Sequence, residues 1–158
     1  MSHNEAVMIA LAPNGARKTQ QDHPQLPISP KEIAHTAAAC LDAGACMLHL
    51  HVRDENLGHS LDAQHYTETI HAIRQQVGNE LIIQVTTEAV GIYSREQQIQ
   101  TVVDVRPEAV SLAIRELSPA GADEKVSAEF FSFLQREYIA PQYIGLLYNT
   151  DAADDISR

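Results

Sequence analysis

Two histidines, His49 and His51, are separated by a single residue inside an otherwise apolar run. The rest of that run has the composition of a buried β-strand, with Cys46, Met47, Leu48, Leu50 and Val52. Because alternate side chains of a strand point to the same face, the two imidazole rings are expected to lie side by side. Imidazole is the commonest ligand of zinc and its neighbouring metals, so the spacing predicts two ligands of one metal ion. A catalytic zinc has three protein ligands and an open position, so hydrogen-bonded core histidines remain the alternative.

Polar and charged side chains also follow each of the other predicted strands. Sites in parallel α/β proteins form at the carboxyl ends of the strands, so these residues are expected to gather on one rim. The candidates are Asn14, Arg17, Lys18, Arg53, Asp54, Thr86, Thr87, Glu88, Arg115, Glu116, Asn149 and Thr150. Each taken singly also fits a structural role, such as a solvated loop charge, a surface ion pair or a strand cap. Together with the two histidines, they predict metal-assisted carbonyl chemistry, in which zinc polarises a ketone or carboxylate oxygen.

The elements that must position these residues alternate between strands and helices. Apolar runs predict strands over residues 6–12, 46–52, 81–85, 109–112 and 139–147. Stripes of apolar residues three and four apart predict helices over residues 30–43, 62–77, 94–103 and 123–137. Two of the helices begin with the capping-box pattern, formed by Ser29 with Glu32 and by Ser94 with Gln97.

Repeated strand–helix units predict a parallel sheet with right-handed crossovers, which is an α/β fold. Two architectures fit this pattern, an open doubly wound sheet and a (β/α)₈ TIM barrel. A complete barrel has about 250 residues, whereas this chain has 158 residues with four strand–helix units and a fifth strand. As a barrel, the chain would be a single domain over residues 1–158 that supplies the first half. The C-terminal half would be absent from the sequence.

Charge and composition argue against several classes of partner. A formal net charge of −10 disfavours nucleic acid and anionic membrane surfaces. No apolar run approaches the roughly 20 residues that span a bilayer, and the N-terminus does not resemble a signal peptide. Cys40 and Cys46 have no disulfide framework around them, so reduced thiols in a cytoplasmic protein are expected. Walker and Rossmann glycine loops, Gly-x-Ser-x-Gly and Cys-x-x-Cys are all missing.

Five segments carry a resemblance to a known family. They are ALAPNGARKT (10–19), DHPQLPISPKEIA (22–34), AGACMLHLHVRD (43–54), SLDAQHY (60–66) and IIQVTTEAVG (82–91). The chain resembles the β-keto acid cleavage enzymes, a family first known as a domain of unknown function, with 3-keto-5-aminohexanoate cleavage enzyme as its named example. The resemblance runs in register over about residues 6–119 and more loosely to about 148.

The resemblance implies a (β/α)₈ barrel that condenses a β-keto acid with acetyl-CoA to give acetoacetate and a new acyl-CoA. It implies that His49 and His51 are two of three zinc ligands. Thr86 matches a substrate-contacting hydroxyl position, and Arg17 matches a specificity position that is a glutamate in the aminohexanoate enzyme. Because a cation here would repel a substrate ammonium, a neutral or acidic β-keto acid is expected. Asn14 joins Arg17 and Thr86 as a candidate substrate-binding residue.

The sequence also departs from the family. The stretch from Leu112 to Leu117, with Arg115 and Glu116, differs from the asparagine- and glycine-bearing stretch of the aminohexanoate enzyme, which suggests another subgroup. The third zinc ligand and two substrate-activating residues belong to the second half of the family's barrel, so they are expected outside this chain. An uncovered half barrel predicts oligomerisation or aggregation, and the resemblance implies a homo-oligomer. The alternatives are a non-catalytic half-barrel that self-associates, another metal-dependent barrel aldolase or hydrolase, and a small-molecule binding protein.

Overall fold

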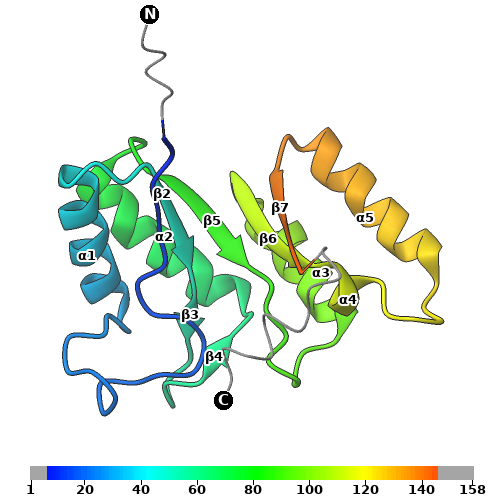
Figure 1. The fold of residues 1–158 in the computed structure, drawn as a ribbon, viewed down its shortest axis with the longest axis horizontal. Coiled ribbons are helices and arrows are strands. Elements are labelled where there is room, and N and C mark those ends of the chain that lie inside the picture. The colour runs from blue at the N-terminus through cyan, green and yellow to red at the C-terminus, as the bar shows by residue number, and fades with distance from the viewer. Residues whose placement is uncertain (1–6, 146–158) are drawn as a thin grey trace, which may run out of the picture.

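The computed structural model describes residues 7–145, in which five parallel strands form a sheet of order β1-β2-β5-β6-β7 (Figure 1). These strands are Ala10–Leu11 (β1), Met47–Leu50 (β2), Ile82–Thr86 (β5), Ala109–Ala113 (β6) and Ala140–Ile144 (β7). A separate antiparallel hairpin pairs Val52–Arg53 (β3) with His59–Ser60 (β4) directly after β2. The sequence predicted all five sheet strands but not this hairpin.

The helices are Pro30–Asp42 (α1), Ala63–Val77 (α2), Arg95–Val105 (α3), Ile114–Leu117 (α4) and Glu124–Arg136 (α5). The four long helices were predicted, whereas the single turn of α4 was not. Strand β1 is shorter than the predicted 6–12, because only Ala10–Leu11 form the ladder with β2, whereas residues 7–9 and 12 are exposed outside it. Residue 6, residues 146–147 of the last predicted strand, Asn149 and Thr150 lie outside the described residues.

Within residues 7–145, no helix has the length and apolar character needed to cross a membrane.

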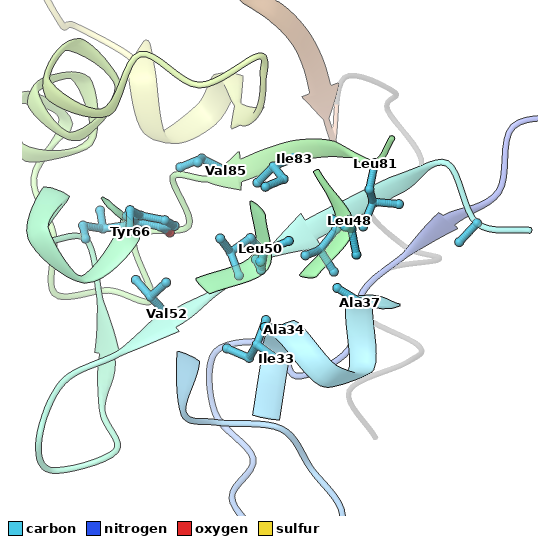
Figure 2. Packing of buried hydrophobic residues seen from close by; sticks show 14 residues of the cluster. Ile33, Ala34, Ala37, Leu48, Leu50, Val52, Tyr66, Leu81, Ile83 and Val85 are labelled. Carbon is cyan, nitrogen blue, oxygen red and sulfur yellow. The ribbon is translucent and has the colours of Figure 1, made fainter. Parts of the chain in front are cut away.

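The hydrophobic core lies on one face of the sheet. Leu50, Val85 and Val110 are in register across β2, β5 and β6, and all three are fully buried. Helices α1 and α2 cover β2 and β5 through Ile33, Ala34, Ala37 and Tyr66 (Figure 2). Ile73 of α2 belongs to the same cluster. Helices α3 and α5 cover β6 through Val102, Phe130 and Leu134. Because in-register residues share a face, the long helices all pack on the same side, which excludes a doubly wound sheet and gives a TIM-barrel-like α/β fold.

The opposite face of the sheet becomes polar toward the carboxyl ends of its strands. Met47 and Ile82 are paired near the amino ends, and polar side chains follow two and four residues later on the same face. They are His49, Gln84, Thr86, Ser111 and Gln142. Gln84, Thr86 and Ser111 are each at most 3% exposed. Buried polar side chains are uncommon unless they are hydrogen-bonded or functional, so this end of the sheet is where a site is expected.

The first helix begins with the predicted capping box. The Ser29 hydroxyl accepts from the Glu32 backbone N–H, and the Glu32 carboxylate accepts from the Ser29 N–H at 2.9 Å. The hydrogen bonds from the backbones of Ser29 and Ile28 lower the pKa of Glu32 from 4.5 to about 2. Ser29→Ala is therefore expected to lower the free energy of unfolding by about 0.5–2 kcal/mol, measured by urea denaturation.

The same capping box predicts a pH dependence. Because the folded pKa of Glu32 is depressed, its stabilisation is complete above pH 4.5 and is lost as the pH falls toward about 2. Glu32→Gln keeps a capping amide, as Gln97 does at the start of α3, but cannot titrate. The stability advantage of the native protein over this variant should therefore shrink below pH 4.5, and a constant difference across that range would contradict the assignment.

Candidate functional site

The two predicted metal ligands do converge. His49 lies in β2, His51 follows its last residue, and their Nε2 atoms are 3.1 Å apart. Two nitrogens bound to one tetrahedral zinc at 2.0–2.1 Å lie about 3.3 Å apart, so the observed separation fits a shared metal ion. The His49 Nδ1 atom is 2.7 Å from the carboxamide oxygen of Gln84. Metal-bound histidines commonly donate their second ring nitrogen to an oxygen acceptor in this way.

His51 is buried and lacks a partner for its second ring nitrogen. Its Nδ1 atom makes no hydrogen bond with the described residues, and the nearest carboxylate oxygen, from Glu88, is 3.9 Å away. Burial, followed by the neighbouring rings of His49 and His59, lowers the pKa of His51 to about 3. A neutral imidazole is the form that binds metals, so this ring is ready to act as a ligand without losing a proton.

The donor set within the described residues is incomplete as a metal site. No group of three or more His, Cys, Asp or Glu side chains in residues 7–145 is arranged to hold a metal ion. The paired Nε2 atoms fit two ligands of a zinc ion that has further ligands from elsewhere. The role of His49 and His51 as metal ligands remains a prediction, as does the location of the third ligand outside this chain.

Asn14 and Arg53 hold the loop after β1 against the site. The buried Asn14 donates its amide to the His51 carbonyl at 3.1 Å, and its Oδ1 atom is buried without a described partner. The Arg53 guanidinium donates to the carbonyls of Gly15, Lys18 and Leu57. These contacts anchor the loop segment that contains Arg17, whose own side chain is exposed. Arg53 therefore holds the loop after β1 by its backbone carbonyls through both terminal guanidinium nitrogens, whereas the Arg53 Nε atom is buried without a described partner.

Thr86 ends β5 on the same face as Gln84, and hydrogen bonds fix its position from two sides. Its carbonyl accepts from the phenol of the fully buried Tyr66 at 2.9 Å, and its hydroxyl oxygen accepts from the Glu88 N–H at 3.2 Å. Burial raises the pKa of Tyr66, so the phenol remains a donor. Among residues 7–145 no group accepts the Thr86 hydroxyl proton, so this hydroxyl can donate to a bound group.

Arg115 and Glu116 lie together in α4 but differ in surroundings. Arg115 is exposed, whereas Glu116 accepts from the Ala89 N–H at 3.1 Å. The buried Gln98 is oriented so that its amide nitrogen donates to Glu116 Oε2 and to the Thr87 carbonyl. Glu116 thus ties α4 to the loop that carries Glu88. Because this loop directly follows Thr86, Glu116 helps to fix the backbone next to the candidate site.

Glu116 predicts a second pH dependence, opposite in sign to that of Glu32. Burial raises its pKa above 4.5, with the Ala89 hydrogen bond acting against this and Glu88 adding to it. A raised folded pKa gives stability that is complete below pH 4.5 and is lost as the pH rises through the folded value. Glu116→Gln cannot ionise, so its stability relative to the native protein should increase between pH 4.5 and 7, as measured by urea denaturation. An unchanged difference over this range would refute the prediction.

A pocket of about 520 Å³ lies on the outer side of this region, against the β3–β4 hairpin and α2. Its lining includes Arg53, Asp54 and His65 but not His49, His51 or Thr86. The Asp54 carboxylate accepts from the backbone N–H groups of the hairpin turn, at Asn56 and Gly58. Asp54 therefore shapes the turn, and the pocket is separate from the paired histidines.

Several residues near the paired histidines were not singled out from the sequence. His59 packs against His51 with ring centroids 5.4 Å apart, and Tyr93 packs against His59 and donates to its carbonyl. Gln84 was missed as well, although a glutamine between Ile83 and Val85 in an apolar strand is a signal of an inward-facing polar group. His59 carried no such signal, because its position depends on the unpredicted hairpin.

The family model and the curated relatives that match this chain all point to the same family of enzymes. A family model described as beta-keto acid cleavage enzyme matches residues 6–149. A 3,5-dioxohexanoate:acetyl-CoA acetone transferase from Paraburkholderia graminis is 41% identical over 59 residues, which are 37% of this chain and 19% of the relative. A 3-keto-5-aminohexanoate cleavage enzyme from Fusobacterium nucleatum is 36% identical over 70 residues, which are 44% of this chain and 26% of the relative.

A third relative and a solved structure extend the comparison. A 3-oxoadipate:acetyl-CoA acetyltransferase from Cupriavidus necator is 30% identical over 67 residues, which are 42% of this chain and 24% of the relative. The ternary complex of ObcA with a C4-CoA adduct and oxalate matches with a TM-score of 0.59 and 20% identity, over 76% of this chain and 31% of that one. The structural likeness shows a shared fold, and the chain spans about a quarter or less of these curated relatives.

Proposed function

The chain belongs to the β-keto acid cleavage enzyme family, and we propose that it acts in the condensation of a β-keto acid with acetyl-CoA. The products are acetoacetate and a new acyl-CoA. Its relatives have names for acetyl-CoA-dependent transfer reactions of this kind, which supports the proposal. The observation that carries it is the pair of Nε2 atoms 3.1 Å apart at the carboxyl end of the sheet.

His49 and His51 would hold a zinc ion through these two nitrogens. When bound, zinc supplies a Lewis acid that polarises the keto and carboxylate oxygens of a β-keto acid. Thr86 offers a hydroxyl proton beside the metal ligands, because its oxygen already accepts from the Glu88 N–H. Asn14 offers a buried amide oxygen without a described partner, which can accept from a substrate or a water molecule. These two groups would orient the substrate and exclude other binding poses.

We place this chain in the first half of a (β/α)₈ barrel. The one-sided helical cover and the polar opposite face fit the wall of a barrel whose interior opens at the carboxyl ends of the strands. The third zinc ligand and the groups that activate the substrate would then come from strands that follow these in the complete barrel. Strands β1 and β7, which have one neighbour each among the described residues, would border the second half.

The substrate of this enzyme would be a neutral or acidic β-keto acid. Arg17 lies in the exposed loop after β1, at the position that the resemblance assigns to specificity. A guanidinium there favours a distal carboxylate and disfavours a distal ammonium. The protein is therefore expected to prefer 3-oxoadipate to 3-keto-5-aminohexanoate, and Arg17→Glu is expected to shift the ratio of the two kcat/KM values by about 10-fold, or about 1.4 kcal/mol, toward the amine.

Arg136→Glu is the matched control for this substitution, since it reverses an exposed charge at the end of α5, before the amino end of β7 and thus at the end of the sheet opposite to the Arg17 loop. It should leave the ratio of the two kcat/KM values unchanged within about twofold, because screened surface charges act weakly at a distance. Equal shifts in the two variants would mean that net charge, rather than the position of Arg17, determines the preference. Preference of the native protein for the amine-bearing substrate would overturn the assignment.

The reaction itself is tested by incubating zinc-loaded protein with acetyl-CoA and 3-oxoadipate, and measuring acetoacetate and the new acyl-CoA. The proposal requires both products, each dependent on both substrates. A metal-dependent aldolase or hydrolase would consume the β-keto acid without acetyl-CoA, and a binding protein would retain it unchanged. A non-catalytic half-barrel would do neither and would self-associate in sedimentation experiments, an alternative supported by the exposure of all five residues of β7.

A further inference from the structure

A chain of hydrogen bonds crosses the polar face of the sheet beneath the paired histidines. Gln84 lies in the middle of β5, and its amide is buried, with 2% of the residue exposed. Its Oε1 atom is 2.7 Å from His49 Nδ1 in β2, and its Nε2 atom donates to Gln142 Oε1 in β7 at 2.8 Å. One amide therefore joins three strands, and both of its ends are occupied.

A small residue makes this connection sterically feasible. Strand β6 lies between β5 and β7, and its Ala109 is in register with Gln84, so the two share a face. Ala140 is the next residue of the same row, in β7. Because both are alanines, the row has room for the Gln84 side chain to pass over β6 and reach Gln142. A larger side chain at 109 would occupy this path.

The direction of the hydrogen bonds determines the protonation of His49. An amide oxygen can only accept, so the ring nitrogen that faces Gln84 Oε1 must carry the proton. In a neutral imidazole the other nitrogen, Nε2, then carries a lone pair, which accepts a hydrogen bond from His51 in the metal-free chain and can bind a metal ion in its place. That nitrogen faces His51 Nε2 at 3.1 Å, where the metal is proposed to bind. Gln142 favours this arrangement, because it accepts from the Gln84 amide nitrogen and so turns the amide oxygen toward His49.

We infer that Gln84, anchored by Gln142, is a positioning residue that holds His49 in the tautomer whose Nε2 is free to bind a metal. The inference rests on the proposed function for the identity of the bound group, but the tautomer itself is a property of the chain without metal. The opposite amide orientation would place an N–H toward His49 Nδ1 and leave the proton on Nε2. Measurement can separate the two orientations, because they give opposite tautomers.

The first test is NMR of the 158-residue chain, with ¹⁵N-labelled histidines, free of metal and at a pH of about 8, where an ordinary imidazole is neutral. His49→Asn identifies the His49 signals. The native protein should show the proton of His49 on Nδ1, and Gln84→Leu should give a mixture of tautomers. A proton on Nε2 in the native protein, or an unchanged tautomer in Gln84→Leu, would overturn the inference.

The second test is zinc affinity, measured by competition with a chromophoric chelator. Loss of an outer partner of a metal-bound histidine typically weakens binding by about 10–100-fold, which is the loss expected for Gln84→Leu. Gln142→Leu should cause a smaller loss, because the amide of Gln84 remains but can rotate. Gln84→Glu offers an acceptor-only oxygen to His49, so it should restore both the tautomer and the affinity, and it remains informative if the leucine variant folds poorly.

Ser111→Ala is the matched control, since Ser111 is equally buried on the same face but its hydroxyl has no described partner. Its zinc affinity and His49 tautomer should equal those of the native protein. An equal loss of affinity in Ser111→Ala and Gln84→Leu would mean that the polar face acts only through general packing, which contradicts a positioning role. If the native protein has the Nδ1–H tautomer but binds no zinc, the proposed function fails while the assignment of the tautomer to Gln84 stands.

Discussion

Alanine at both His49 and His51 is expected to abolish zinc binding, together with any acetoacetate formation. The double substitution removes both nitrogen donors whose Nε2 atoms are 3.1 Å apart. Loss of an outer partner alone costs about 10–100-fold in metal affinity, so loss of two ligands should exceed about 1,000-fold. Elemental analysis of chelator-washed and zinc-reloaded protein measures the stoichiometry, and competition titration measures the affinity.

His71→Ala is the control for this experiment, because His71 is an exposed histidine of α2 that bonds only the side chain of Gln75 among the described residues. Its zinc content should be that of the native protein. Since His51 is buried, the double variant His49→Gln/His51→Gln should be tested beside the alanine pair, and both should be checked for folding by circular dichroism. Native zinc content in a folded double variant would show that the metal binds elsewhere.

The sequence was sufficient to predict the elements that depend on local interactions. The helix starts at Ser29 and Ser94 follow from capping boxes that each form within four residues, and the structure confirms both. The parallel sheet follows from the alternation of apolar strands and amphipathic helices. The strand and helix pattern alone left a barrel and a doubly wound sheet open, and the family resemblance implied the barrel. The structure supports a TIM-barrel-like α/β fold, because the long helices share one face of the sheet.

Features that depend on distant residues were not predictable in the same way. The β3–β4 hairpin pairs two residues on each side, which is too short a run to produce a recognisable alternation. The position of His59 against His51 depends on that hairpin. Gln84 meets His49 across 35 residues of sequence and Gln142 across 58. The candidate histidines were therefore visible in the sequence, whereas the groups that orient them became visible only in three dimensions.

Arg53 illustrates the difference between a residue's place in the sequence and its contacts. It follows the histidine pair and was therefore predicted to be a member of the catalytic rim. In the structure it is 9% exposed, and its guanidinium donates to the Gly15 carbonyl at 2.7 Å, to Lys18 at 3.0 Å and to Leu57 at 2.9 Å. The site depends on Arg53 through the loop after β1, which carries Asn14 and Arg17.

Arg53→Met is accordingly expected to lower the free energy of unfolding by about 2–4 kcal/mol, because three carbonyls lose a charged donor inside the protein. Arg53→Lys should recover only part of this, since a single ammonium cannot match the spread of the guanidinium donors. Urea denaturation measures both effects. Amide hydrogen exchange should also become faster in residues 14–18, whose backbone the guanidinium holds in place.

Arg106→Met provides the comparison, because Arg106 is a surface arginine whose side chain is 60% exposed and bonds Glu137 at 2.9 Å. Exposed pairs of this kind contribute about 0–1 kcal/mol, so the control should lose little stability and none of the protection in residues 14–18. Equal stability of the two methionine variants would mean that the loop after β1 is held by other contacts. If Arg53→Met instead loosens that loop while zinc still binds at His49 and His51, metal binding and substrate positioning are separable. Arg53 would then act on substrate recognition through Asn14 and Arg17 without touching the metal ligands.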